Sequence, residues 1–161
     1  MTTTSDLLPV DYNALRTNQA LIITLLIVAF VASVPALALF VGLVMAVGAL
    51  VGAPGFKPVY KYIVKPLGIK PDVMQDNPEP HRFAQALGAV FVLAGSVALF
   101  AGLPVLGWAL SWLVIALFAL ILFGGFCVGC FFYYWLGRLR VPGFNKAPPS
   151  DTIPGMRPRG E

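Results

Sequence analysis

No charged residue interrupts the stretch FAQALGAVFVLAGSVALFAGLPVLGWALSWLVIALFALILFGGFCVGCFFYYWLG, residues 83–137. Residues 17–56 form a second stretch without charge. Since a membrane-spanning helix needs about 20 apolar residues, each stretch has room for two helices. The whole chain is 58% hydrophobic and only 11% charged, whereas a soluble domain is about 25% charged. The sequence therefore predicts an all-α membrane protein with four transmembrane helices arranged as two helical hairpins.

Each stretch contains a break that ends at a proline, a residue that suits the first turn of a helix better than its interior. The breaks are SVP at 33–35 and AGLP at 101–104. The predicted helices therefore cover residues 17–33, 36–53, 82–101 and 105–138. The first two are short, so a hairpin that enters the membrane only part-way is an alternative. The last would be about 50 Å long, and Gly124-Gly125 is its predicted kink.

The lysines and arginines all lie in the N-terminal segment, in the loop between the hairpins or at the C-terminal end. They are Arg16, Lys57, Lys61, Lys65, Lys70, Arg82, Arg138, Arg140, Lys146, Arg157 and Arg159. In a four-helix topology these segments share one side of the membrane, and the positive-inside rule makes that side the cytoplasm. The net charge of +4 is thus explained by topology and by anionic headgroups, not by nucleic acid.

These observations divide the chain into five parts. They are an N-terminal cytoplasmic segment (1–16), a first transmembrane hairpin (17–53), an amphipathic cytoplasmic loop (54–82), a second hairpin (83–138) and a proline-rich cytoplasmic tail (139–161). The first 15 residues lack the basic region of a secretory signal peptide, so the first helix is expected to be retained. The predicted location is the bacterial inner (plasma) membrane, with both termini cytoplasmic. The tail is expected to be extended, and ordered only by a partner.

Two groups of residues are predicted to lie at the membrane interface. Lys57, Lys61 and Lys65 recur every fourth residue, along one face of a helix that Pro58 and Pro66 limit to about two turns. A docking surface for a soluble partner is the alternative. Tyr133, Tyr134 and Trp135 follow as an aromatic belt; a platform for a pigment or quinone is possible, but the residues do not favour it.

Most familiar chemistry is excluded. The charge-free stretches hold no carboxylate or lysine for proton or ion transport, and the chain has no phosphate-binding loop or dinucleotide fingerprint. The sequence implies no cofactor, and a conventional hydrolase or transporter would leave more traces. The one histidine, His81, precedes the third helix, where a cap or headgroup contact is more common than a metal ligand; Asp76 or Asn77 could cap that turn.

Cys127 and Cys130 are the remaining candidates for chemistry. Three residues apart on a helix, they share a face, and about 12 Å of helix separates Cys130 from Arg138, in the cytoplasmic leaflet. Because that side is reducing, the resting state is expected to be the dithiol. Helix packing is the main alternative: Gly48 with Gly52, and Gly125 with Gly129, have the spacing that lets membrane helices approach closely. A metal site would require further ligands beyond two thiols.

Three segments together resemble the bacterial integral-membrane family catalogued as domain of unknown function 4395. They are VDYNALRTNQA, DNPEPHRFAQALG and FCVGCFFYYWL, and the resemblance covers about residues 10–137. The family has no assigned activity. The resemblance implies that its motif residues act together at the cytoplasmic helix ends, with a polar cluster supporting the cysteines. That cluster comprises Asn13, Arg16, Asn18, Gln19, Arg82 and Gln85.

Two functions from different classes are left open. The first is thiol redox chemistry or sulfur handling through Cys127 and Cys130, with a soluble thiol-redox protein as partner. The second is a non-catalytic accessory subunit of a larger respiratory or photosynthetic membrane complex, which the lack of ionisable intramembrane residues and the glycine-rich helices would fit. In both cases the lipid bilayer is the surrounding partner and nucleic acid is not.

Overall fold

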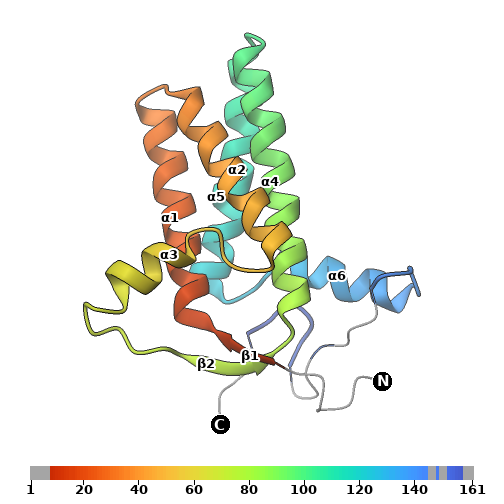
Figure 1. Ribbon diagram of the computed structural model, residues 1–161. Helices are drawn as coiled ribbons and strands as arrows, with labels where there is room; N and C mark the ends of the chain where they lie inside the picture. The colour runs from red at the N-terminus through yellow and green to blue at the C-terminus, as the bar shows by residue number, and fades with distance from the viewer. Residues whose placement is uncertain (1–7, 145–147, 149–151, 158–161) are drawn as a thin grey trace.

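Four long helices form the body of the protein in the computed structural model, which describes residues 8–144, 148 and 152–157 (Figure 1). They are α1 (Tyr12–Val31), α2 (Pro35–Val51), α4 (Pro78–Phe100) and α5 (Pro104–Gly124). Both α2 and α5 pack on α4, and α1 packs on α2 and α5. The predicted helix breaks at 33–35 and 101–104 are confirmed.

The four long helices begin at a proline or at a side-chain cap. Proline occupies the first turn of α2, α4 and α5, and the Asp11 side chain accepts the backbone N–H groups of Asn13 and Ala14 at the start of α1. As a result α1 and α4 start several residues before the predicted boundaries. The physical reason is that hydropathy marks the apolar part of a helix, whereas the polar first turns of α1 and α4 continue the helix toward their caps.

Three of the four long helices, α1, α4 and α5, are long and apolar enough to cross a membrane. The fourth, α2, is apolar but has only 17 residues, about 26 Å of helix. The fold is thus that of a mostly helical protein with three candidate membrane-spanning helices.

The interior of the bundle is filled by aliphatic side chains and by close backbone contacts. Ile22, Leu26 and Met45 are fully buried between α1, α2 and their neighbours. Where α4 meets α5, a Cβ on Gly107 would lie 2.7 Å from the carbonyl oxygen of Gly95. In a membrane, lipid already solvates apolar side chains, so helices are held together mainly by dispersion contacts. Close backbone approach of this kind increases those contacts.

A two-stranded antiparallel ribbon lies across one end of the bundle (Figure 1). Its strands are β1 (Leu8–Asp11) and β2 (Val73–Asp76), with Leu8 opposite Asp76. The expectation of a purely helical chain is therefore wrong at this point. Each strand is only four residues long. Because the α1–α2 helical hairpin lies between the two strands in the sequence, no tight-turn signal of a β-hairpin marks their pairing.

The last predicted helix, 105–138, is two helices and not one kinked helix. After α5 ends at Gly124, the chain turns at Gly125 and α6 (Val128–Arg138) starts in a new direction, across the end of the bundle (Figure 1). Gly125 adopts φ +66°, a left-handed conformation that glycine reaches without steric cost. The Gly124-Gly125 pair was correctly identified as the weak point, but it ends the helix completely.

The loop between the hairpins contains a short helical segment made of α3 (Lys57–Val59) and the π-helical turn η2 (Tyr60–Val64). The predicted limit of about two turns is confirmed. Lys57, Lys61 and Lys65 are exposed there.

The two predicted glycine pairs do not form small-residue ridges. Gly52 (φ +77°) and Gly125 are left-handed residues that end α2 and α5, the role that glycine commonly has after a helix. The other glycine of each pair does lie at a close contact. A Cβ on Gly129 would lie 2.6 Å from the Cβ of Ala84 in α4, and a Cβ on Gly48 would lie 2.7 Å from the backbone of Gly55.

Gly129→Ala is expected to destabilise the protein by about 1–3 kcal/mol, because the new methyl group overlaps the backbone of Ala84 and forces α6 away from α4. The control is Gly124→Ala, whose new Cβ meets only the flexible end of Leu120, at 3.3 Å. Thermal unfolding in detergent measures the difference, expected as a fall of about 2–10 °C in Tm for Gly129→Ala and little change for Gly124→Ala. Equal Tm values would contradict the contact.

Candidate functional site

The two cysteines stand at the junction between α5 and α6. Cys127 has extended backbone (φ −99°, ψ 103°) and is the N-cap residue of α6; its Sγ accepts the backbone N–H of Cys130 at 3.1 Å. The pair is therefore at the start of a helix, not within one as the sequence predicts. Unpaired N–H groups and the helix dipole at such a position stabilise negative charge, including that of a thiolate.

Cys127 and Cys130 form a disulfide, with Cα atoms 5.2 Å apart. The structure therefore holds the oxidised form, where the sequence predicts the dithiol. Each cysteine is less than 5% exposed, yet both line a pocket of about 50 Å³ between the ends of α1, α4 and α5 and the C-terminal residues 152–157. The disulfide is thus covered by the chain but borders a space that reaches solvent.

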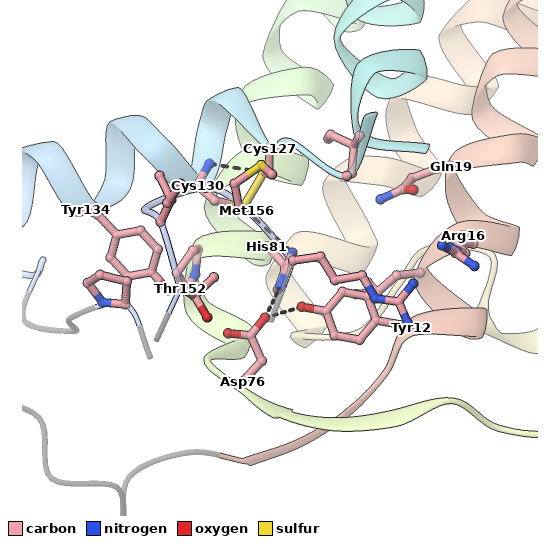
Figure 2. A pocket seen from close by; sticks show the side chains of 18 residues that line it. Tyr12, Arg16, Gln19, Asp76, His81, Cys127, Cys130, Tyr134, Thr152 and Met156 are labelled. Carbon is pink, nitrogen blue, oxygen red and sulfur yellow. Dashed lines mark hydrogen bonds and ion pairs between the residues drawn. A yellow bond between two sulfur atoms is a disulfide. The ribbon is translucent and has the colours of Figure 1, made fainter. Parts of the chain in front are cut away.

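His81 connects the disulfide to a buried carboxylate (Figure 2). From the first turn of α4, its Nδ1 lies 3.7 Å from the Sγ of Cys130 and its Nε2 lies 2.9 Å from Oδ2 of Asp76. The Tyr12 hydroxyl donates a hydrogen bond to the same Asp76 oxygen. A line of polar groups therefore runs from Tyr12 in α1 through Asp76 and His81 to the cysteines.

Asp76, the last residue of β2, is 5% exposed. Burial alone would raise the pKa of this carboxyl group. The hydrogen bonds from His81, Tyr12 and the backbone N–H of Asn77 outweigh that effect and hold the pKa of Asp76 below its usual range. Asp76 is therefore a carboxylate at neutral pH, fixed so that it orients the imidazole of His81.

The C-terminal residues 152–157 cover the disulfide. The backbone N–H of Cys127 donates to the carbonyl of Gly155 at 2.7 Å, and that of Arg157 donates to the carbonyl of Gly125 at 3.1 Å. The Arg157 side chain forms an ion pair with Asp72 and places its guanidinium 4.8 Å from the centre of the Tyr12 ring. The expectation that only a partner orders the tail is wrong for this segment, because the chain's own backbone and charges hold it.

Replacing Arg157 by leucine is expected to make the disulfide about two to five times more reactive toward dithiothreitol. The substitution removes a partly exposed ion pair and a cation–π contact, which together stabilise the closed segment by about 1 kcal/mol. Arg138→Leu, at the exposed end of α6, is the matched control. The rate of reduction is followed by alkylation and gel shift. An unchanged rate in Arg157→Leu would show that the segment does not limit access.

The aromatic belt predicted for α6 is wrong for two of its three residues. Tyr133 and Tyr134 are 4% and 7% exposed, whereas Trp135 is 49% exposed. The Tyr133 hydroxyl donates to Glu79 at 2.7 Å. Burial and the negative charge of Asp76 raise the pKa of Tyr134, which borders the pocket, to about 12. Because α6 turns across the bundle, its Tyr133–Tyr134 face packs on the protein itself.

The predicted polar cluster is divided by the structure. Arg16 and Gln19 line the pocket beside the cysteines. The other four side chains bind the backbone of neighbouring segments: Asn13 donates to Lys70, Asn18 accepts from Phe56, Arg82 donates to Ala49 and Leu50, and Gln85 donates to Met45. Arg82 thereby satisfies carbonyl groups at the C-terminal end of α2, which have no partner within their helix. These four residues are structural supports.

The site residues that the sequence prediction missed are Tyr12, Asp76 and His81 as a connected set. Tyr12 and Asp76 are 64 residues apart in the chain and meet only because β1 pairs with β2. The available signal was that all three fall within the first two resemblance segments, VDYNALRTNQA and DNPEPHRFAQALG. For Asp76 and His81 a cap or headgroup contact explained the sequence without the ribbon, and Tyr12 carried no prediction of its own.

This fold and site define a class of protein. Its members are helical, have helices of membrane-spanning length, and place a cysteine pair beside a histidine–carboxylate pair. The chain belongs to the family described as Domain of unknown function (DUF4395), whose family model matches residues 10–138. The match covers the bundle, β2, the second half of β1, α6 and both cysteines, and ends before residues 152–157. No curated protein and no solved structure matches the chain significantly.

Proposed function

We propose that this protein is a membrane thiol–disulfide oxidoreductase whose redox centre is the Cys127–Cys130 pair. The observation that carries the proposal is the position of the disulfide: at a helix N-terminus, beside a pocket, and in contact with a histidine that a buried carboxylate orients. A disulfide that only stabilised the fold would require neither the histidine nor the pocket. Its loop also spans only three residues, so it limits the unfolded chain little.

The proposed topology has four spans, with both termini in the cytoplasm of a bacterial cell and the bundle in the inner membrane. In support, the described lysines and arginines gather at the end of the bundle that carries the ribbon and α6, whereas the turns at the opposite end carry none. The positive-inside rule assigns the basic end to the cytoplasm. With about 26 Å of helix, α2 would span with slight local thinning of the bilayer.

This topology itself favours redox function over a structural disulfide. Cytoplasmic thiols are kept reduced, and disulfides that do form there are usually transient and catalytic or redox-sensing. A cysteine pair that can close on the cytoplasmic side is therefore expected to cycle between disulfide and dithiol. The proposed exchange partner is a soluble dithiol protein.

The exchange step uses only the disulfide and that dithiol. A partner thiolate attacks the sulfur of Cys127; a new S–S bond forms, the Cys127–Cys130 bond breaks, and the electron pair leaves on Cys130. His81, 3.7 Å away, is placed to pass a proton to that sulfur. The partner's second thiolate then attacks the mixed disulfide and displaces Cys127, which is protonated from solvent. The partner is oxidised to a disulfide, and Cys127 and Cys130 are reduced to two thiols.

Alkylation with a membrane-permeant maleimide tests the proposal in membranes of the expressing cell. The wild type is expected to take up two labels after reduction, none after mild oxidation with diamide, and two again after the oxidised sample is reduced by thioredoxin and its reductase. The double variant Cys127→Ser/Cys130→Ser is the control for background. Labelling that does not change with the redox treatment would overturn the proposal.

No contact or surface among the described residues particularly favours the alternative role, as an accessory subunit of a larger complex. Gentle detergent extraction followed by native electrophoresis tests it, and a lone small species would count against it.

A further inference from the structure

The cysteine pair, once reduced, has a third potential metal ligand beside it. Nδ1 of His81 and the two sulfur atoms lie within 4.8 Å of one another, and no other group of three or more His, Cys, Asp or Glu side chains so arranged occurs in the described ranges 8–144, 148 and 152–157. The histidine comes from α4 and the cysteines from the α5–α6 junction. The fold thus supplies the additional ligand that two thiols need to form a metal site.

We propose that the dithiol form binds one thiophilic divalent ion of the zinc class through Cys127, Cys130 and His81. The inference rests on the proposed function in one respect, since the disulfide must be reducible before the sulfurs can act as ligands. Disulfide and metal are then mutually exclusive states of one site. The ion holds the two thiolates, and when a disulfide of the exchange partner takes up two electrons from them and is reduced to a dithiol, the Cys127–Cys130 bond forms and the ion is released.

The observed spacing suits such an ion. With Zn–S bonds of about 2.3 Å and a Zn–N bond of about 2.0 Å, tetrahedral geometry separates sulfur from nitrogen by about 3.5 Å. The distance from Cys130 Sγ to His81 Nδ1 is 3.7 Å. The two sulfurs have to separate from bonded contact to about 3.8 Å, and Cys127 Sγ, which lies within 4.8 Å of His81 Nδ1, has to come to about 3.5 Å from it. Cys127 is an N-cap residue outside the regular helix.

The surroundings of His81 match those of a metal-bound imidazole. Its Nε2 lies 2.9 Å from Oδ2 of Asp76, and a carboxylate on the far nitrogen of a ligating histidine fixes the ring and increases its basicity. This leaves Nδ1 directed toward the sulfurs. In the Asp76–His81 pair the carboxylate is therefore a positioning residue and not a ligand.

Charge and ligand type select the class of ion. Two thiolates and a neutral imidazole compensate a divalent cation exactly in charge, which matters because both cysteines are buried. Thiolate and imidazole ligands are those of zinc, whereas magnesium and calcium require oxygen. The 50 Å³ pocket beside the sulfurs has room for a water molecule in the fourth position, which makes the site open.

Titration with Co²⁺ as a spectroscopic substitute for zinc tests the inference. The full-length protein is reduced with a phosphine, its thiols are counted, and it is titrated in detergent without oxygen. The expected result is one equivalent of Co²⁺ with thiolate charge-transfer and tetrahedral d–d bands, which one equivalent of Zn²⁺ removes. His81→Asn is expected to weaken binding at least tenfold and Asp76→Asn about 10- to 100-fold, whereas Arg138→Ala is expected to bind as the wild type.

The outcomes separate this inference from the proposed function. If the thiol count shows a fully reduced and re-oxidisable pair but no cobalt bands appear, the metal site is overturned and the redox proposal stands. If the pair cannot be reduced in the folded protein, the redox proposal fails and the metal site fails with it. A wild-type cobalt spectrum in His81→Asn would overturn the assignment of His81 as a ligand.

Discussion

Asp76→Ala is expected to lower the free energy of unfolding by about 3–5 kcal/mol, the cost of removing one member of a buried charged network. The Asp76 carboxylate accepts hydrogen bonds from Tyr12 in α1, from His81 in α4 and from the Asn77 backbone. Without it, the buried Tyr12 and the partly buried His81, from different helices, lose their common partner. The ribbon and the starts of both helices are then no longer joined.

Thermal unfolding in detergent measures this effect, with an expected fall in Tm of at least about 6 °C. Asp72→Ala is the matched control, because Asp72 is also a carboxylate of the ribbon region but is partly exposed, and within the described residues its side chain pairs with Arg157. Its loss is expected to cost about 1 kcal/mol or less. Equal destabilisation by the two substitutions would contradict the central position that we give to Asp76.

The second large effect is expected from the two single cysteine variants, which distinguish the sulfur that exchanges with the partner from the sulfur that leaves. In Cys130→Ser, Cys127 is left as a lone thiol at the N-terminus of α6, where the helix dipole and backbone N–H groups stabilise its thiolate. In Cys127→Ser, the remaining Cys130 lies inside the first helical turn, beside His81. Cys127 is therefore expected to be the faster nucleophile.

Reaction with an aromatic disulfide, 5,5′-dithiobis(2-nitrobenzoic acid), measures the two rates directly. We expect Cys130→Ser to react about ten times faster than Cys127→Ser, and to keep the mixed disulfide that the wild type resolves. The double serine variant gives the baseline. A faster reaction of Cys127→Ser would reverse the assignment and make Cys130 the sulfur that is attacked.

The helical body could be predicted because two strong signals coincide. Long charge-free stretches predict how many apolar helices fit, and Pro35 and Pro104 mark where new helices begin. Both signals are local and need no knowledge of packing. The early starts of α1 and α4 were missed because polar first turns look like loops to a hydropathy argument.

The glycines show why a four-residue spacing does not by itself predict close helix packing. A glycine four residues from another is typical of close helix packing, but a glycine at the end of an apolar run is equally typical of a helix end. Gly125 belongs to the second kind, and its left-handed conformation is what separates α6 from α5. The close helix contacts at Gly95 and Gly107 carry no spacing signal, since they lie on different helices.

The candidate site could be predicted only in part. The cysteines were evident from their spacing, and Arg16 and Gln19, which the sequence analysis grouped with them, line the same pocket. The Tyr12–Asp76–His81 connection depends on the pairing of two four-residue strands, which lie on either side of a complete helical hairpin. No periodicity in the sequence predicts such a pairing, because strands this short carry too little pattern.

The redox potential of the Cys127–Cys130 pair tests the central claim most directly. The purified protein is equilibrated in a series of thiol–disulfide buffers, quenched by alkylation and resolved by mass. We expect a single two-electron transition between about −180 and −270 mV, the range of enzymes that exchange disulfides. A pair that stays oxidised below about −300 mV, as structural disulfides do, or that forms no disulfide in any buffer, would contradict the claim.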